Sequence, residues 1–286
     1  MELLAKAVPV ALLGFVVSSM LAVGLSLTVG QILVPLRNGR LVILALVANF
    51  VLMPLTALLI ARVFRLDQPL GVALLLLGGA AGAPFLPKLA GVAKGNLAFA
   101  VGLMVLLMVL TVGYMPLVMP LLLEGVSVDP LEIARSLVVL MLLPLMIGLA
   151  VRACWAGAAG RAAPVLNKIS TISLAIMIVL MLVTNLRDII DLYGTRGVLA
   201  SLVFLLVGFG LGWLLGGPGR ETRSVMAMGT AQRNIAAALV VGGQNFKEPR
   251  VVVMVVVVAI VGLLVLMPLG RRVARPAESS GGASRV

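Results

Sequence analysis

The sequence predicts an all-α polytopic membrane protein, and its composition and apolar pattern are the observations behind that prediction. Of the 286 residues, 62% are hydrophobic and only 11% are charged, whereas soluble proteins carry about 25% charged residues. The apolar runs approach the roughly 20 residues that a helix needs to span a bilayer, and they lack the two-residue alternation of barrel strands. Because no polar stretch is long enough to fold alone, we expect a single transmembrane domain over 1–270.

Nine apolar runs, separated by charged or Gly/Pro-containing loops, predict nine membrane-spanning helices. Their ranges are 8–28, 41–61, 70–87, 96–121, 136–151, 165–185, 198–216, 224–243 and 251–269. The first run is longer than the apolar part of a signal peptide and has no clear cleavage site, which favours a retained helix. The polar, Gly- and Ser-rich segment 271–286 is predicted to be a disordered cytoplasmic tail.

Basic residues are distributed unevenly between the two sets of loops. If the N-terminus lies outside, the inner loops and the tail hold 13 Lys and Arg residues and the outer loops hold eight. Because cytoplasmic loops are enriched in basic residues, this bias predicts a multi-pass protein of the plasma (inner) membrane, with its N-terminus outside and its C-terminus in the cytoplasm. The same bias accounts for the net charge of +12, so no nucleic-acid partner is needed to explain it.

Two of the nine runs contain residues that interrupt a helix. In run 70–87, Pro84 and Pro87 have no backbone N–H to donate and follow a glycine-rich stretch. In run 224–243 we expect a break from Gly229 to Asn234, with four polar side chains: Thr230, Gln232, Arg233 and Asn234. The two runs lie five spans apart and therefore cross in opposite directions, which is the mark of inverted repeats with a transport site between two broken helices.

Arg233 lies near the middle of run 224–243, so its charge would be deep in the bilayer. A charge at this depth costs about 2.5 to 3.5 kcal/mol on insertion scales, and such residues face a protein or aqueous interior and mark functional sites. Two hypotheses follow for its guanidinium group. It holds an anionic group of a substrate through its fork of donors, or it only ties down the broken helix.

Four stretches of the chain resemble the bile acid:sodium symporter family. They are Met20-Leu-Ala-Val-Gly-Leu-Ser-Leu-Thr28, Ala48-Asn-Phe-Val-Leu-Met-Pro54, Gly82-Ala-Pro84 with Ala93-Lys-Gly-Asn96, and Gln232-Arg-Asn234. The resemblance implies two inverted repeats, two crossing broken helices, and a core domain that moves against a panel domain. It implies a nine-span form whose first repeat lacks one helix, with the core near 41–121 and 198–269 and the panel near 8–28 and 136–185.

The resemblance also implies two sodium sites, but their ligand positions are substituted in this chain. These positions are occupied by Leu86, Pro87, Ala100, Met104, Gly229 and Arg233. Hard cations require several oxygen ligands, so the substitutions predict transport that does not depend on sodium. A sodium-coupled symporter with a remodelled ion site is the alternative, because Asn49, near a glutamine position of the family, and backbone carbonyls remain.

Other chemistries have little support in the sequence. The chain has no His and a single Cys, Cys154, so it offers no His/Cys metal site, no internal disulfide and no expected cofactor. Asp188 and Asp191 faintly resemble a metal-diphosphate site of prenyltransferase-like membrane enzymes, but no second acidic cluster accompanies them. A channel or scaffold is a further alternative, although polar residues gather at the breaks and not along several helices.

We therefore predict a secondary transporter, and not an enzyme, that carries a small or amphipathic organic anion by alternating access. Its partners would be the substrate and the lipid bilayer, and it could act as a monomer. The residues expected to bind the substrate are Arg233, Asn234, Gln232, Thr230, Pro84, Pro87 and Asn49. The positive charge of Arg233 would take the place of a cation that relatives bind from solution.

Overall fold

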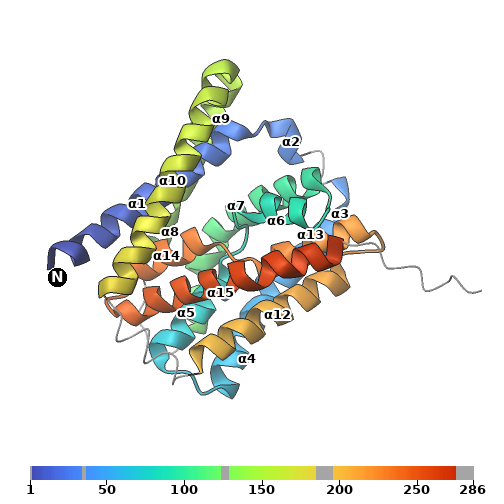
Figure 1. Ribbon diagram of the computed structural model, residues 1–286. Coiled ribbons are helices and arrows are strands. Elements are labelled where there is room, and N and C mark those ends of the chain that lie inside the picture. The colour runs from blue at the N-terminus through green and yellow to red at the C-terminus, as the bar shows by residue number, and fades with distance from the viewer. Residues whose placement is uncertain (1, 34–36, 124–128, 185–195, 275–286) are drawn as a thin grey trace, which may run out of the picture.

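The computed structural model describes residues 2–33, 37–123, 129–184 and 196–274, and all regular structure in these ranges is helical (Figure 1). The helices are α1 (Glu2–Ser26), α2 (Val29–Leu33), α3 (Gly39–Val47), α4 (Met53–Val63), α5 (Gln68–Gly79), α6 (Leu86–Val92), α7 (Leu97–Leu122), α8 (Pro130–Leu137), α9 (Leu143–Cys154), α10 (Ala156–Thr184), α12 (Gly197–Leu215), α13 (Arg220–Ala231), α14 (Ile235–Asn245) and α15 (Pro249–Ala274). One π-helical turn, Ala48–Leu52, joins α3 to α4, and another, Val138–Leu142, joins α8 to α9.

Seven helical segments of the described chain are long and apolar enough to cross a bilayer. They are Ala7–Ser26, Gly39–Val63, Leu97–Leu122, Pro130–Cys154, Ala156–Leu180, Gly197–Leu215 and Pro249–Ala274. The other two predicted runs, 70–87 and 224–243, coincide with two pairs of short helices, α5 with α6 and α13 with α14. The chain is thus an all-helical, multi-pass membrane protein, while the count of nine crossings stays a prediction.

Several predicted boundaries differ from the structure, among them the starts of the first and fifth spans, since α1 begins at Glu2 and α8 at Pro130. The second break begins at Gln232 and not at Gly229, because α13 continues through Thr230 to Ala231. α10 begins at Ala156, nine residues before the predicted start at 165, since this Ala-rich stretch has a high helix propensity despite its glycines. α15 extends to Ala274, so the predicted tail is helical at 271–274, and its remainder lies outside the described residues.

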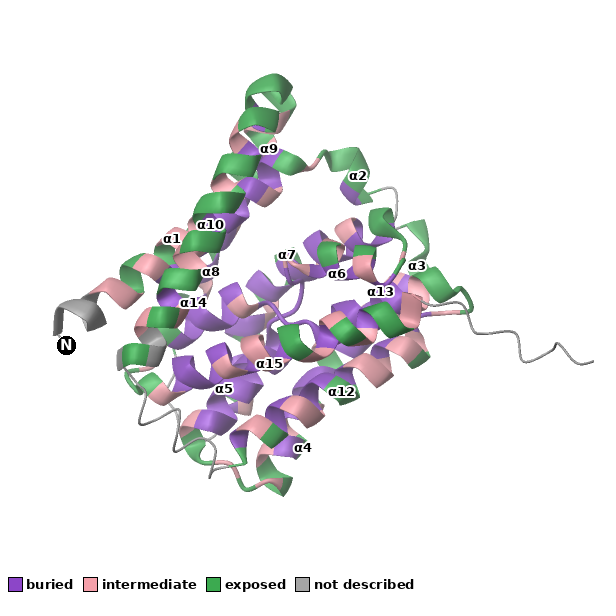
Figure 2. Cartoon of the chain, in the orientation of Figure 1, coloured by how far each residue is buried: buried purple, intermediate pink, exposed green. Residues whose placement is uncertain are grey.

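The two broken pairs lie in the most buried part of the molecule. Every residue of α5 from Leu70 to Gly79 is buried, and so is every residue of α14 from Ala236 to Gly242. Figure 2 shows α5 and α14 mostly in purple, and both pack against α15. Because short interrupted helices leave backbone polar groups free, they are tolerated at membrane depth only when protein surrounds them.

Helices α1, α9 and α10 form a separate group on one side of the molecule (Figure 1). α1 crosses α9 at a contact between two glycines: a Cβ atom on Gly24 would lie 2.9 Å from the Gly148 Cα, and one on Gly148 would lie 2.6 Å from the Leu21 carbonyl oxygen. Small residues let membrane helices approach this closely. The group meets the remaining helices through contacts of α1 with α14 and with the π-helical turn Val138–Leu142.

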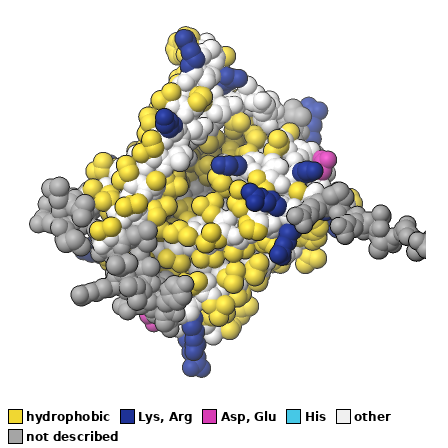
Figure 3. Space-filling view, in the orientation of Figure 1, with side chains coloured by type: hydrophobic (Ala, Val, Ile, Leu, Met, Phe, Trp, Pro, Cys, Tyr) yellow, Lys and Arg dark blue, Asp and Glu magenta, His cyan; other side chains and the backbone are white. Residues whose placement is uncertain are grey.

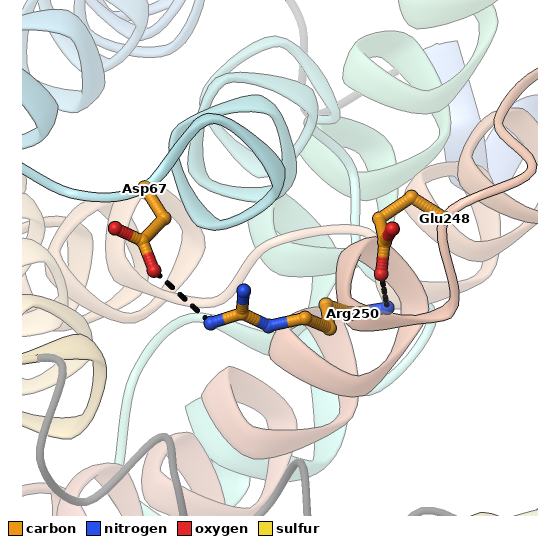
Figure 4. Close-up of polar contacts among 3 residues, drawn as sticks. All are labelled: Asp67, Glu248 and Arg250. Atoms are coloured by element: carbon orange, nitrogen blue, oxygen red, sulfur yellow. Dashed lines mark hydrogen bonds and ion pairs between the residues drawn. The ribbon is translucent and has the colours of Figure 1, made fainter.

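The outer surface has the character of a lipid-facing protein. Large apolar side chains are exposed on several helices, among them Leu121 at 78% and Leu214 at 76%, and Figure 3 shows hydrophobic side chains over much of the visible face. Arg250 at the start of α15 contacts Asp67 before α5 at 3.1 Å, as Figure 4 shows. Both side chains are partly exposed, so this ion pair contributes at most about 1 kcal/mol.

Candidate functional site

The two breaks touch each other at the centre of the buried region. The backbone N–H of Asn234, in the second break, donates a hydrogen bond to the carbonyl oxygen of Ala80, in the first, at 2.9 Å. The end of α5 and the start of α14 are thereby joined across 154 positions of sequence. This crossing of the two breaks, as the sequence predicts, is the candidate functional site.

The first break is shaped by a close approach to α7. Ala80 ends α5 in an extended conformation, and Gly82 follows with a φ of +77°, which glycine adopts readily because it has no Cβ. A Cβ on Gly82 would lie 2.2 Å from the Met108 nitrogen and 2.6 Å from the Met104 carbonyl oxygen. The glycine therefore lets the broken chain pack directly on the backbone of α7.

Thr111 of α7 supplies hydrogen bonds that the first break lacks. Its hydroxyl oxygen accepts from the Ala81 N–H at 3.0 Å, and the hydroxyl group donates to the Ala81 carbonyl oxygen at 3.1 Å. Both residues are fully buried. Without the Thr111 hydroxyl, the N–H and the carbonyl group of Ala81 would be shielded from water and would lose their hydrogen-bond partner. One side chain thus satisfies the donor and the acceptor of the same residue.

The π-helical turn Ala48–Leu52 frees two further carbonyl groups beside the crossing. Pro54 has no N–H to donate to the Phe50 carbonyl four residues earlier, and the Met53 N–H donates to Ala48 instead of Asn49. The Tyr114 hydroxyl of α7 donates to the freed Phe50 carbonyl oxygen at 2.6 Å. The freed Asn49 carbonyl points to the crossing, where it accepts from Arg233 at 3.4 Å.

Arg233 is the side chain that connects these elements. It is 1% exposed. Its Nε donates to the Leu77 carbonyl oxygen at 2.8 Å and its Nη2 to the Gly78 carbonyl oxygen at 2.7 Å, both in the last turn of α5. Its Nη1 donates to the Asn49 Oδ1 at 2.6 Å and to the Thr230 carbonyl oxygen at 3.2 Å. Together with the bond to the Asn49 carbonyl, these contacts engage all five N–H donors of the guanidinium.

The charge of Arg233 is matched by carbonyl dipoles and not by a carboxylate. Where the structure describes acidic side chains, all of them are exposed and none faces the crossing: Asp67, Asp129, Glu132, Glu221 and Glu248. The acceptors of Arg233 include the C-terminal carbonyls of α5 and α13, and a helix C-terminus carries a partial negative charge of about −0.5. The guanidinium is thus a buried cation that two helix ends stabilise together.

Asn234 presents a donor without a partner at the same place. Its Oδ1 accepts from the Ala237 N–H at 3.1 Å and so caps the N-terminus of α14. Its Nδ2 is buried and has no hydrogen-bond partner. Buried polar groups are rarely left unsatisfied, and an exception calls for a specific explanation such as a ligand. A donor of this kind, at the positive end of a helix, suits an anionic oxygen.

The side chains of the remaining predicted residues make fewer polar contacts at the crossing. Thr230 is fully buried in α13, and its hydroxyl accepts from the Asn49 Nδ2 at 3.5 Å. Gln232 is 8% exposed, and its Oε1 faces Gly262 of α15. Pro84 and Pro87 are half-buried in the turn before α6 and in its first turn, and no hydrogen bond links them to Arg233.

Thr111 and Tyr114 belong to this site although the sequence did not predict them there. Both are polar residues in the apolar helix α7, three positions apart and therefore on one face. A hydroxyl in an apolar span is a weak signal, because its partner is often a carbonyl of its own helix. Their partners here are 30 and 64 residues away, so only the folded chain identifies them.

Four of the six positions implied as sodium ligands are buried and apolar. Leu86, Ala100, Met104 and Gly229 are all buried. A Cβ on Gly229 would lie 3.1 Å from the Leu86 Cδ2 and 3.6 Å from the Leu103 Cδ2, so hydrocarbon fills the space beside the glycine. These side chains offer no oxygen and therefore do not fit a sodium ion.

The model of the sodium bile acid symporter family matches residues 12–192, which is more than half of the chain. The chain belongs to the sodium bile acid symporter family. A search of curated proteins finds no match.

Membership in the sodium bile acid symporter family supports a membrane transporter, since the members of this family are transporters and not enzymes. The match includes the first break, the π-helical turn with Asn49, and α7 with Thr111 and Tyr114. It ends before α12, so the second break with Arg233 and Asn234 lies outside it. The acidic pair Asp188 and Asp191, considered for an enzyme, lies outside the described residues.

Proposed function

We propose that the protein is a secondary carrier of a small or amphipathic organic anion, and that the anionic group binds at the crossing of the two breaks. The observation that carries this proposal is the pairing of a buried cation with an unpartnered donor. Arg233 has no acidic partner among the described side chains, and the Nδ2 of Asn234 next to it has no acceptor. A carboxylate or sulfonate would supply the missing acceptor and the missing negative charge.

The two residues would act in different ways on the bound anion. All five donors of Arg233 are engaged with protein oxygens, so its contribution in this arrangement is the electrostatic field of its charge. Asn234 and the positive end of α14 would make the direct contact, as half-helix N-termini do with anionic substrates in other carriers. Gln232, Thr230, Asn49, Pro84 and Pro87 stay predicted contributors to the same site.

The proposed movement is alternating access. The panel would comprise α1, α9 and α10, which contact one another, and the core would comprise the two broken pairs with α4, α7, α12 and α15. We place the N-terminus outside and the C-terminus in the cytoplasm, with nine crossings in two inverted repeats. This arrangement exposes a site between the broken helices to each side in turn.

The experiment is a transport assay with purified protein in sealed vesicles. A panel of radiolabelled carboxylates and sulfonates, including bile acids, is offered with sodium chloride or with choline chloride outside. We expect saturable uptake of at least one anion that does not require sodium, and counterflow when unlabelled anion is loaded inside. Conductance without saturation would contradict the carrier and favour a channel, and steep sodium dependence would favour a remodelled ion site.

A further inference from the structure

Arg233 lies where a carrier of this kind would hold a coupling cation. Its five acceptors are all oxygens: four backbone carbonyls, of Leu77, Gly78, Thr230 and Asn49, and the side-chain oxygen of Asn49. A shell of carbonyl and amide oxygens is the coordination that a hard metal cation takes. In carriers with broken helices, sodium is bound by unwound carbonyls and by the C-terminal ends of half-helices.

The oxygen shell is assembled from three separate elements. Leu77 and Gly78 lie in the last turn of α5, Thr230 lies in the last turn of α13, and Asn49 lies in the π-helical turn Ala48–Leu52. Their carbonyls lie at two helix ends and in the π-helical turn, where regular helical bonding is interrupted, although that of Leu77 also accepts from the Ala80 N–H at 3.2 Å. If the guanidinium were removed, all of these oxygens except that of Leu77, which also accepts from Ala80, would lose the donors they have here in a buried site, which is unfavourable.

We propose that the Arg233 guanidinium is a resident cation that takes the place of a transported sodium ion at the crossing, and that a neutral side chain at position 233 opens this place to sodium. The proposal rests on the proposed function only in taking the crossing to be the transport site. It explains how a chain in a sodium symporter family can lack the oxygen side chains at Leu86, Ala100, Met104 and Gly229. The positive charge is supplied by the chain and need not be loaded from solution.

The test measures thermal unfolding of the full chain in detergent, so it does not depend on knowing the substrate. Wild type, Arg233→Gln, Arg233→Ala and Arg233→Lys are each titrated with sodium chloride, with choline chloride holding the ionic strength constant. We expect the midpoint of wild type and of Arg233→Lys to be indifferent to sodium, since both keep a cation. Arg233→Gln and Arg233→Ala should unfold several degrees lower in choline and regain stability saturably with sodium, because a ligand of the native state stabilises it by mass action.

The matched control is Arg250→Gln, which removes a guanidinium from a partly exposed ion pair at the surface. Its unfolding midpoint should show no saturable response to sodium. Three outcomes would overturn the proposal: folded Arg233→Gln and Arg233→Ala that ignore sodium, a wild type that sodium stabilises equally, or neutral variants that fail to fold in either salt while Arg233→Lys folds. A failure of the carrier function would appear in the vesicle assay and leave these midpoints unchanged.

Discussion

At the scale of single residues, the site depends on side chains that repair an interrupted backbone. Arg233, Thr111 and Tyr114 each bond carbonyls that the breaks or the π-helical turn release. These bonds fix the positions of the interrupted helices. Experiments must therefore distinguish a role of each side chain in substrate binding from a role in folding. Isosteric substitutions make that separation possible.

The first prediction concerns Asn234, which caps α14 through Oδ1 and presents an unpartnered Nδ2. Asn234→Asp keeps the capping oxygen and adds a negative charge at a helix N-terminus, so the variant should fold at least as stably as wild type. It replaces the free donor by an acceptor, so anion affinity should fall by about tenfold or more, the worth of one hydrogen bond to a charged group. Concentration-dependent uptake in vesicles measures the affinity.

The control for this prediction is Asn96→Asp. Asn96 caps α7 in the same manner, through a bond to the Phe99 N–H at 2.9 Å, and its side chain is exposed. It should leave uptake unchanged. Equal uptake by Asn234→Asp and wild type would show that the free amide does not contact the substrate.

The second prediction concerns Thr111. Thr111→Val keeps the shape of the side chain but removes both hydrogen bonds to Ala81, and each buried group left without a partner costs about 1–3 kcal/mol. Thr111→Ser keeps the hydroxyl and should lose much less stability. Thermal unfolding of the two variants in detergent compares them directly, and equal midpoints would mean that water or another group takes the place of the hydroxyl.

At the scale of helices, the sequence predicts the elements better than their ends. The first interruption was readable because Gly82 and Pro84 act locally on the backbone, whereas Pro87 lies in the first turn of α6 and does not break it. The second was readable from the polar residues around Arg233. The start of α10 at Ala156 was missed, since alanine and glycine read as a loop when charged residues flank them. The π-helical turn Ala48–Leu52 could not be predicted, because the partners of its freed carbonyls, Tyr114 of α7 and Arg233 in the second break, are distant in sequence.

The third prediction is that Gly82→Ala disrupts the first break. Alanine would meet the α7 backbone at 2.2 Å and would have to adopt a positive φ, which alone costs about 1–2 kcal/mol. We expect loss of folded yield, or a much lower unfolding midpoint, together with loss of transport.

The comparison for Gly82→Ala is Gly113→Ala in α7, where a Cβ would meet nothing within 4 Å. That change should stabilise the helix slightly, by up to about 1 kcal/mol, because alanine favours helix over glycine. If both variants behaved alike, the contact between the first break and α7 would not be needed for the fold.

At the scale of the whole molecule, the family and the all-helical multi-pass fold could be predicted from sequence, whereas partners within the site could not. The apolar runs were enough to predict the fold, and the four stretches that resemble the family were enough to predict the family, because both are local patterns in the sequence. The site joins Asn49, Leu77 and Arg233 from three distant segments, and their contacts exist only after the chain packs. Direct binding of substrate by these residues stays a prediction.

The fourth prediction uses Cys154, the one cysteine of the chain, which is exposed near the end of α9. The proposed topology places it on the cytoplasmic side. A membrane-impermeant maleimide should not label intact cells and should label them once they are permeabilised, whereas Cys154→Ser should never be labelled. Labelling of intact cells would reverse the proposed orientation.

The five bonds that hold the guanidinium in place bear on how voltage acts on transport. A sodium symporter moves sodium ions together with its substrate. The membrane potential, negative inside, then favours inward movement of these positive charges. A cation that stays with the protein returns at the end of each cycle, so its own movement across the field cancels and only the charge of the substrate is transferred. With the cell interior negative, each 100 mV would favour the exit of a monovalent anion by about 2.3 kcal/mol. If the protein carries a monovalent anion without exchange, as proposed, equal concentrations on the two sides would therefore give net release of the anion from the cell.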